Sequence, residues 1–280
     1  MALPDYVILG AMKCGTSTLA AQLGAQEGLF MTTPKEPNFF SDDDIYGRGM
    51  AWYEALFDAA QQGDLRGEAS THYTKLPTYP QTLARLDAAL EAPKLIYMIR
   101  DPLKRAVSHY MHEWSQGVIT CPLEEALTRH REIIDYGRYA MQIAPWAARY
   151  GADHILVLSL EEMQRAPQET LTRAGDFLGR AGLVWKDDLG QVNVSAERIR
   201  KFPLHGLLID NPLARGLRRA LVPQALRDKI KQGRQMQERP TLGAADRARL
   251  SEIFAADRAD LQALFPNRPD LDASYGFALS

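Results

Sequence analysis

Residues 6–18 read Tyr6-Val7-Ile8-Leu9-Gly10-Ala11-Met12-Lys13-Cys14-Gly15-Thr16-Ser17-Thr18. The apolar run at 6–9 is typical of a buried strand, and the glycines that follow allow the chain to turn sharply. Leu19 and Leu23, four residues apart, predict a helix over 16–26. A strand, a glycine-containing loop and a helix in immediate succession favour an α/β fold.

The rest of the chain extends this pattern. The clearest further strand is Lys94-Leu-Ile-Tyr-Met-Ile99, which ends at Arg100-Asp101-Pro102, where an N-cap aspartate and a proline predict the start of a helix. Shorter runs predict strands at 65–69 and 154–158, and prolines predict an extended loop over 31–38. Further helices are predicted over 52–60, 79–90, 122–135, 138–150 and 167–180. Strands that alternate with helices predict a parallel sheet flanked by helices.

The chain is expected to form one domain over residues 1–280, with a helical, sheet-poor part from about residue 191. The last part carries apolar residues at helical spacing, which predict a helix packed back on the domain. These residues are Leu250, Ile253, Phe254, Leu261, Leu264 and Phe265.

Composition excludes several classes of protein. With 33 basic and 35 acidic residues the net charge is −2, so no global positive field favours nucleic-acid binding and any anion site must be local. Two cysteines are too few for a disulfide framework or a four-cysteine zinc site. No apolar run approaches the ~20 residues of a membrane span, and the first residues lack the features of a secretory signal. We therefore expect a soluble, cytoplasmic protein; the sequence leaves its oligomeric state open.

The loop at 10–18 has the chemistry of an anion site. A helix N-terminus offers unpaired N–H groups and the positive end of a dipole, which together bind phosphate. Lys13 adds a charge, and Thr16, Ser17 and Thr18 add hydroxyl donors. In the loop of nucleotide triphosphatases, Gly-x-x-x-x-Gly-Lys-[Ser/Thr], a lysine follows the second glycine. Here Thr16 follows Gly15, which argues against ATP or GTP hydrolysis.

A second candidate site begins at Arg100. This residue ends a strand, and the carboxyl ends of parallel strands are where open α/β sheets bind ligands. Ser108 lies eight residues on, inside the predicted helix. A guanidinium and a hydroxyl together can bind a second phosphate.

The two segments together, Gly-x-x-Lys-x-Gly-Thr-x-x-Leu and Arg-Asp-Pro-x-x-Arg-x-x-Ser-x-Tyr, resemble the sulfotransferases that use 3′-phosphoadenosine-5′-phosphosulfate (PAPS). The resemblance covers roughly residues 5–265. It implies a P-loop-like three-layer α/β fold and transfer of a sulfuryl group from PAPS to an acceptor hydroxyl by in-line displacement, with the bisphosphate PAP as product. It also implies that the first loop binds the 5′-phosphosulfate, and that Arg100 and Ser108 bind the 3′-phosphate.

Lys35-Glu36-Pro37-Asn38-Phe39-Phe40 and Gly67-Glu68-Ala69-Ser70-Thr71-His72-Tyr73 are similar to segments of the carbohydrate (heparan-type) branch. Gly137-Arg138-Tyr139, Trp146 and 177–179 are similar to later landmarks of the family. That branch has a lysine at position 69 and commonly a histidine at position 38, where this chain has Ala69 and Asn38. The acceptor therefore stays open among a carbohydrate, a lipid and a small metabolite.

By resemblance, Lys13 and Glu36 are the catalytic residues: Glu36 takes the proton of the acceptor, and Lys13 stabilises the charge on the leaving oxygen. His72 and His109 are rival bases. The implied nucleotide-binding residues are Lys13, Gly15, Thr16, Ser17, Thr18, Arg100 and Ser108. No metal is expected, and Cys14 is interpreted as a small residue that fills the loop.

The sequence has no Arg-Lys-Gly motif of the kind that the cytosolic branch uses near its C-terminus. Arg198, Arg200 or Lys201 are candidates for the same charge. Two alternatives to sulfuryl transfer stay open: a P-loop kinase or nucleotide triphosphatase, and a non-catalytic nucleotide-binding module.

Overall fold

The structure is a computed structural model that describes residues 3–189, 236, 238–266, 268 and 270–278. Its centre is a five-stranded parallel sheet with the strand order β2-β3-β1-β4-β5. β1 (Tyr6–Gly10) lies in the middle and pairs with β3 (Leu65–Ala69) and β4 (Lys94–Ile99). β2 (Leu29–Met31) and β5 (Ile155–Ser159) form the edges. The predicted parallel α/β architecture is confirmed.

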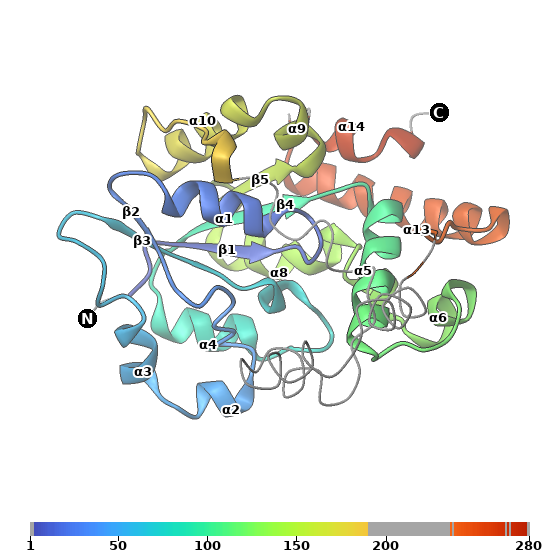
Figure 1. Ribbon diagram of the computed structural model, residues 1–280, viewed down its shortest axis with the longest axis horizontal. Helices are drawn as coiled ribbons and strands as arrows, with labels where there is room; N and C mark the ends of the chain where they lie inside the picture. Colours follow the sequence, from blue (N-terminus) through green and yellow to red (C-terminus); the bar gives the residue numbers. More distant parts are fainter. Residues whose placement is uncertain (1–2, 190–235, 237, 267, 269, 279–280) are drawn as a thin grey trace, which may run out of the picture.

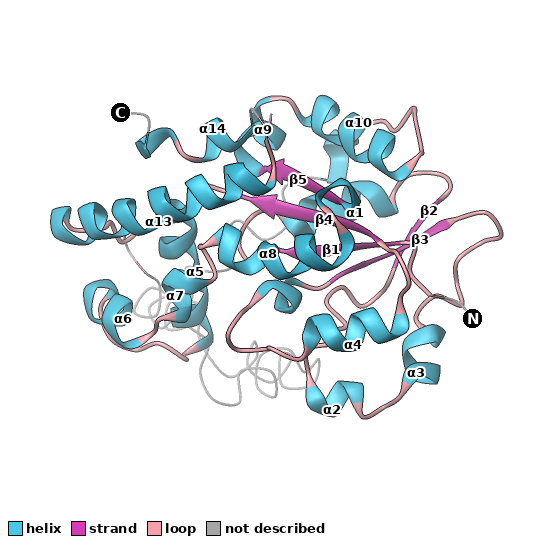
Figure 2. Ribbon diagram, turned by 180° about the vertical axis from the view of Figure 1, so that it is seen from behind, coloured by secondary structure: helices cyan, strands magenta, loops and turns pink. Residues whose placement is uncertain are grey.

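The central strands are apolar because both faces of the sheet are covered. All residues of β1 and β5 are buried, and so are all residues of β4 except Lys94. On one face lies α1 (Thr16–Gly24), which packs against α10 (Pro167–Leu178). Figure 2 shows α4 (Thr82–Ala89) and α8 (Tyr139–Tyr150) in front of the opposite face. These layers form the three-layer arrangement that Figure 1 shows from the other side.

The C-terminal helix α13 (Ala244–Leu264) packs against α8 and buries Leu250, Phe254 and Leu261. The apolar residues at helical spacing therefore predicted both this helix and the face of it that is buried. Asp257, on the same helix, accepts hydrogen bonds from the backbone N–H groups of Ala140 (2.9 Å) and Met141 (3.2 Å). Because these groups belong to the first turn of α8, the carboxylate caps that helix.

At the carboxyl ends of the strands lies α5 (Pro102–Gln116), which follows β4 directly. The Asp101 carboxylate accepts from the N–H groups of Leu103 and Lys104, and Pro102 occupies the first turn, as predicted. The remaining elements are α2 (Asp43–Tyr46), α3 (Met50–Ala55), α6 (Leu123–Arg129), α7 (Glu132–Asp135), α9 (Leu160–Arg165), α14 (Asp270–Ser274) and the 3-10 turns Thr71–Thr74, Ala152–His154, Asp187–Leu189 and Gly276–Ala278.

Several predicted boundaries were wrong, among them that of the helix predicted over 79–90, which is α4 and begins at Thr82. Met31 belongs to β2 and not to a loop. The helix predicted over 52–60 is α3 and ends at Ala55. The single helix predicted over 122–135 is two helices, α6 and α7, and His154 lies in a turn before β5 rather than in the strand. Residues 190–235, which include Arg198, Arg200 and Lys201, lie outside the described residues.

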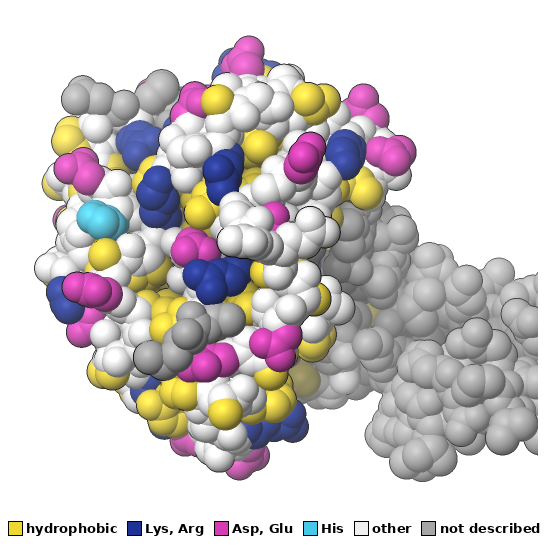
Figure 3. All heavy atoms as spheres, turned by 90° about the vertical axis from the view of Figure 1, so that its left-hand side faces the viewer, with side chains coloured by type: hydrophobic (Ala, Val, Ile, Leu, Met, Phe, Trp, Pro, Cys, Tyr) yellow, Lys and Arg dark blue, Asp and Glu magenta, His cyan; other side chains and the backbone are white. Residues whose placement is uncertain are grey.

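The surface that Figure 3 shows lies at the left of Figure 1, where the strands begin. Basic and acidic side chains are interspersed on this face, and no large area carries one sign of charge. In the described part of the chain, no helix combines the length and the apolar character that crossing a membrane requires.

Candidate active site

The loop between β1 and α1 lies at the carboxyl edge of the sheet, where open α/β sheets bind ligands. The N–H of Ala11 donates to the carbonyl of Met98 (2.8 Å), which ties the loop to β4. Gly15 precedes α1 with φ of 88°, in the left-handed region that favours glycine. A Cβ at Gly15 would lie 2.8 Å from Leu160 Cδ1 and 2.9 Å from Met163 Cε, so the side chains of α9 also require glycine here. Gly15 therefore fixes the position of the first N–H groups of α1, those of Thr16 and Ser17, while the N–H of Thr18 donates to the carbonyl of Gly15 at 3.0 Å.

Lys13 brings its charge to this loop from a left-handed backbone conformation, with φ of 69°. Burial and the neighbouring Arg100 guanidinium lower the pKa of its ammonium to about 8, although Glu36 acts in the opposite direction. An ammonium that is partly desolvated beside a second cation is stabilised by an anionic ligand. The position of Lys13 therefore suits an anion.

Arg100 follows the last residue of β4, as predicted, and lies beside this loop. Its Nη1 donates to the carbonyl of Lys13 at 3.2 Å, across 87 residues of sequence. Ser108 lies in the second turn of α5 and is 7% exposed. The cationic groups of both candidate sites, Lys13 and Arg100, are thus in neighbouring loops that contact each other. Ser108 is on α5, the helix that follows Arg100.

Tyr139, at the start of α8, contacts both the backbone of Arg100 and the loop that carries Lys13. Its hydroxyl donates to the carbonyl of Arg100 (2.8 Å) and accepts from the N–H of Arg100 (3.2 Å). Cys14 Sγ lies 3.4 Å from the same hydroxyl, and both side chains are fully buried. Burial raises the pKa of the Cys14 thiol to about 11, so the thiolate needed for nucleophilic attack is disfavoured.

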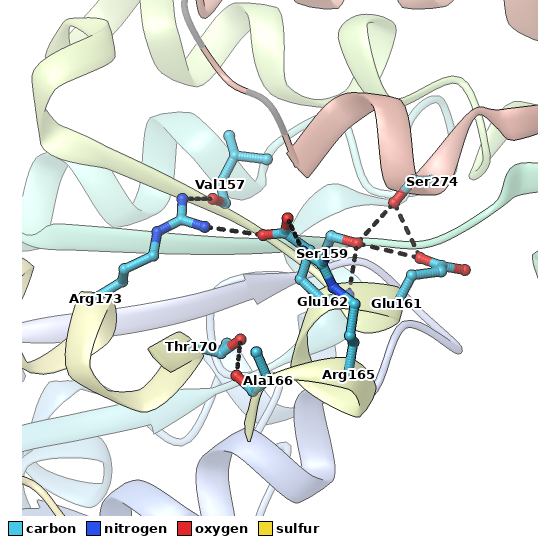
Figure 4. A network of polar contacts seen from close by, with 9 residues as sticks. All are labelled: Val157, Ser159, Glu161, Glu162, Arg165, Ala166, Thr170, Arg173 and Ser274. Atoms are coloured by element: carbon cyan, nitrogen blue, oxygen red, sulfur yellow. Dashed lines mark hydrogen bonds and ion pairs between the residues drawn. The ribbon is translucent and has the colours of Figure 1, made fainter. Parts of the chain in front are cut away.

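A polar network supports the start of α5. Figure 4 shows Ser274 of α14 pointing toward Ser159, at the end of β5, and toward Glu161 of α9. Ser274 Oγ lies 3.0 Å from both Ser159 Oγ and Glu161 Oε2. The other oxygen of Glu161 accepts from the N–H of Asp101 (3.1 Å), the residue after Arg100. The C-terminal part of the chain is thereby connected to the backbone that carries Arg100.

Glu36 enters from a third segment. Its N–H donates to the carbonyl of Ala69 at 2.9 Å, which fixes the loop to the carboxyl end of β3. Glu36 and Asn38 have φ values of 60° and 54°. Left-handed conformations cost roughly 1–3 kcal/mol for residues other than glycine, so this loop keeps its shape only because surrounding contacts stabilise it.

The Glu36 carboxylate is held from two sides. Lys35 Nζ lies 2.6 Å from one oxygen, and Thr71 Oγ1 donates to the other at 3.2 Å. Burial acts to raise the pKa of Glu36, but the ammoniums of Lys35 and Lys75, together with His72, outweigh it and hold the pKa below its usual value. Glu36 is therefore ionised at neutral pH, as a group that accepts a proton must be.

The two rival bases are in different surroundings. His109 is 2% exposed, with Nδ1 at 3.4 Å from Arg105 Nη1 and Nε2 at 3.6 Å from Glu113 Oε1. His72 stacks on Tyr79, with 4.7 Å between ring centroids. Burial lowers the pKa of both imidazoles to about 4. His109 has both ring nitrogens engaged, whereas His72 lies near Glu36 and is the more serious rival.

Sequence reasoning missed Lys75. Burial lowers the pKa of its ammonium to about 8, while the carboxylates of Glu36 and Glu113 attract it. It also lies 5.7 Å from the ring centroid of Tyr136. No sequence signal links residues 36, 75 and 113, because the fold alone brings them together. Among the described residues, no group of three or more His, Cys, Asp and Glu side chains could hold a metal ion.

A family model and several named proteins are similar to this chain. The family model "Sulfotransferase domain" matches residues 3–198. Heparan sulfate glucosamine 3-O-sulfotransferase 3A1 of Mus musculus is 31% identical over 186 residues, which are 63% of this chain and 46% of that protein. The 3B1 enzyme of Homo sapiens is 32% identical over 187 residues, again 63% of this chain and 46% of that protein. The chain thus spans about half the length of these curated relatives.

The fold agrees with a solved structure. A sulfotransferase from Alicyclobacillus acidocaldarius matches with a TM-score of 0.69 and 24% identity, covering 94% of this chain and 96% of that one. At this identity the likeness concerns the fold alone, and the fold includes the parallel sheet on which the loop, Arg100 and Glu36 converge. With a family model that matches 196 residues between 3 and 198, the chain belongs to the sulfotransferase domain family.

Proposed function

We propose that this protein is an enzyme that transfers a sulfuryl group from PAPS to an acceptor hydroxyl, and that residues 1–280 form one sulfotransferase domain. The observation that carries the proposal is the contact between Arg100 Nη1 and the carbonyl of Lys13. It places the cation at the end of β4 beside the loop that starts α1. Two anion-binding segments so close together suit a nucleotide that carries phosphate at both its 5′ and 3′ positions.

In the proposed complex, the N–H groups of Thr16 and Ser17 and the hydroxyls of Thr16, Ser17 and Thr18 bind the 5′-phosphosulfate, and Gly15 lets the backbone approach it. Lys13 compensates the charge that develops on the oxygen bridging sulfur and phosphorus. Arg100 and Ser108 bind the 3′-phosphate. Charge-assisted bonds of this kind are stronger than neutral hydrogen bonds, so they favour PAPS over nucleotides without a 3′-phosphate.

The chemistry is an in-line displacement at sulfur. The acceptor oxygen forms a bond to sulfur while the bond from sulfur to the bridging oxygen breaks, and PAP leaves. Glu36 takes the proton of the acceptor hydroxyl, for which its ionised state is required. As in phosphoryl transfer, positioning and electrostatic stabilisation supply most of the acceleration. No step requires a metal ion.

For the acceptor we propose a hydroxyl compound, with carbohydrates first because the relatives reported above are named for heparan sulfate glucosamine. Ala69 and Asn38 depart from the pattern of that branch, so lipids and small metabolites belong in the same screen. We place the protein in the cytoplasm, since both of its cysteines are free. We expect no nucleic-acid partner, because the net charge is −2.

The test is a screen of acceptors with PAPS labelled at sulfur. The proposal expects label to move to an acceptor hydroxyl and PAP to appear in equal amount. PAP binding without any transfer would favour the non-catalytic nucleotide-binding module. Magnesium-dependent release of phosphate from ATP, without use of PAPS, would favour the kinase or triphosphatase alternative.

A further inference from the structure

Glu68 is a carboxylate with no access to solvent, next to the segment that carries Glu36. It belongs to β3 and its exposed fraction is 0%. Three hydroxyl groups converge on it: Tyr53 Oη donates to Oε2, Ser70 Oγ donates to Oε1 at 2.7 Å, and Tyr73 also hydrogen-bonds the carboxylate. A buried carboxyl group is tolerated only when such bonds satisfy it.

Two of these hydroxyls also contact the loop of Glu36. Ser70 Oγ accepts from the N–H of Asn38 at 3.0 Å, and Tyr73 Oη accepts from the N–H of Phe40 at 3.4 Å. Each hydroxyl thus stands between the carboxylate and one backbone N–H. The two N–H groups belong to Asn38 and Phe40, two and four residues after Glu36, in a loop with left-handed residues at 36 and 38.

The direction of these bonds follows from the groups on either side of each hydroxyl. A hydroxyl has one hydrogen, and a backbone N–H can only donate. Ser70 and Tyr73 therefore accept from the loop and direct their hydrogens to the oxygens of Glu68. Burial raises the pKa of Glu68, and the hydrogen bonds from the three hydroxyls act in the opposite direction. A neutral amide at position 68 would place an N–H₂ group against one of the hydroxyls, and that hydroxyl would then have to accept from the amide.

We propose that Glu68 is a positioning residue for Glu36: by orienting the hydroxyls of Ser70 and Tyr73, it holds the loop that places the base against the acceptor. The inference rests on the proposed function only where it concerns turnover. That Glu68 holds the N–H groups of Asn38 and Phe40 in place, through the hydroxyls of Ser70 and Tyr73, does not depend on the reaction.

The first test follows native-state hydrogen exchange of the Asn38 and Phe40 amides. Glu68→Gln should speed exchange of at least one of them by about tenfold, since a lost hydrogen bond opens the loop locally. Ser70→Ala should speed exchange of Asn38 alone, and Tyr73→Phe that of Phe40 alone. Asp87→Asn, which breaks an exposed ion pair with Arg149, is the matched carboxylate control and should change neither amide.

The second test measures conversion of PAPS to PAP with heparan sulfate as the acceptor probe. Displacement of a reacting group costs on the order of 10- to 100-fold in rate, so Glu68→Gln should lower kcat by that factor and leave PAP affinity unchanged. The double variant Glu36→Gln/Glu68→Gln should be no slower than Glu36→Gln alone, because Glu68 acts through Glu36.

Unchanged exchange of both amides in Glu68→Gln, or additive losses of kcat in the double variant, would overturn the inference. If Glu68→Gln does not fold, the Ser70→Ala and Tyr73→Phe variants test the inference instead. Unchanged exchange of the Asn38 and Phe40 amides in both variants would also overturn it. Absence of turnover in the unmodified protein would count against the proposed function or the probe, and the exchange measurement would still decide the role of Glu68.

Discussion

The hydroxyl of Tyr139 donates to the carbonyl of Arg100 at 2.8 Å and accepts from the N–H of the same residue at 3.2 Å. One buried oxygen thus fixes the backbone of the residue that begins the second anion-binding segment. Cys14, in the first segment, lies 3.4 Å from the same oxygen. The relative position of the two segments therefore depends on a side chain that belongs to neither.

Removing this hydroxyl should weaken both stability and nucleotide binding. Tyr139→Phe removes two part-buried hydrogen bonds to the backbone of Arg100, each worth roughly 0.5–1.5 kcal/mol of unfolding free energy. Affinity for PAP should fall several-fold, since Arg100 is less well placed. Calorimetry and denaturant unfolding measure both effects. Tyr150→Phe, at the other end of α8, is the control and should keep normal PAP affinity; equal losses in the two variants would contradict this role of Tyr139.

Arg100 should control the preference for a 3′-phosphate. Hydrogen bonds to charged groups are worth about 1.5–3 kcal/mol each, so the protein should bind PAP at least tenfold more tightly than AMP. Arg100→Gln should remove most of that preference and change AMP binding little. Arg149→Gln, on the surface beside Asp87, should leave the ratio unchanged. Equal affinities of the unmodified protein for PAP and AMP would refute the two-site interpretation.

The pH dependence of kcat/KM for PAPS should reflect the titration of the Lys13 ammonium. Its ammonium, with a pKa of about 8, is charged below that pH and loses its charge above it. The apparent kcat/KM for PAPS should therefore fall as pH rises through about 8. An anionic nucleotide favours the charged form, so the corresponding limb of kcat should lie at higher pH. In Lys13→Arg the limb should vanish, because arginine stays charged; a limb that persists there would belong to another group.

Chelation of metal ions should leave turnover intact. In the proposed mechanism Lys13, Arg100 and the N–H groups at the start of α1 provide the positive charge for the phosphosulfate, so no ion is needed. Activity with PAPS should be equal with and without excess EDTA. Complete loss that magnesium restores would instead support the kinase or triphosphatase alternative.

The parts of the fold that sequence reasoning found are those with strong local signals. The apolar run Lys94–Ile99 is β4 to the residue, and Asp101 with Pro102 starts α5. The strand β2 was missed because it has only three residues, Leu29–Met31, and exists through its pairing with β3.

The same distinction holds for the site. The position of Arg100 at the carboxyl edge of the sheet was predicted from the rule that open α/β sheets bind ligands there, whereas its contact with the carbonyl of Lys13 was not predicted. The contact of Tyr139 with Arg100 and the attraction between Lys75 and Glu36 depend on how distant elements pack. Nothing in the spacing of these residues encodes such packing, so only the structure reveals it.

The most direct test of the central claim is kcat for sulfuryl transfer from PAPS by Glu36→Gln, measured beside His72→Ala and His109→Ala with the best acceptor from the screen. Glutamine keeps the shape of the side chain but cannot take the proton, and general-base catalysis contributes about 10²–10⁴-fold. We predict that Glu36→Gln loses kcat by about that factor with PAPS affinity nearly unchanged, while both histidine variants retain turnover. Near-normal turnover in Glu36→Gln, with one histidine variant inactive, would contradict the account and assign the base to that histidine.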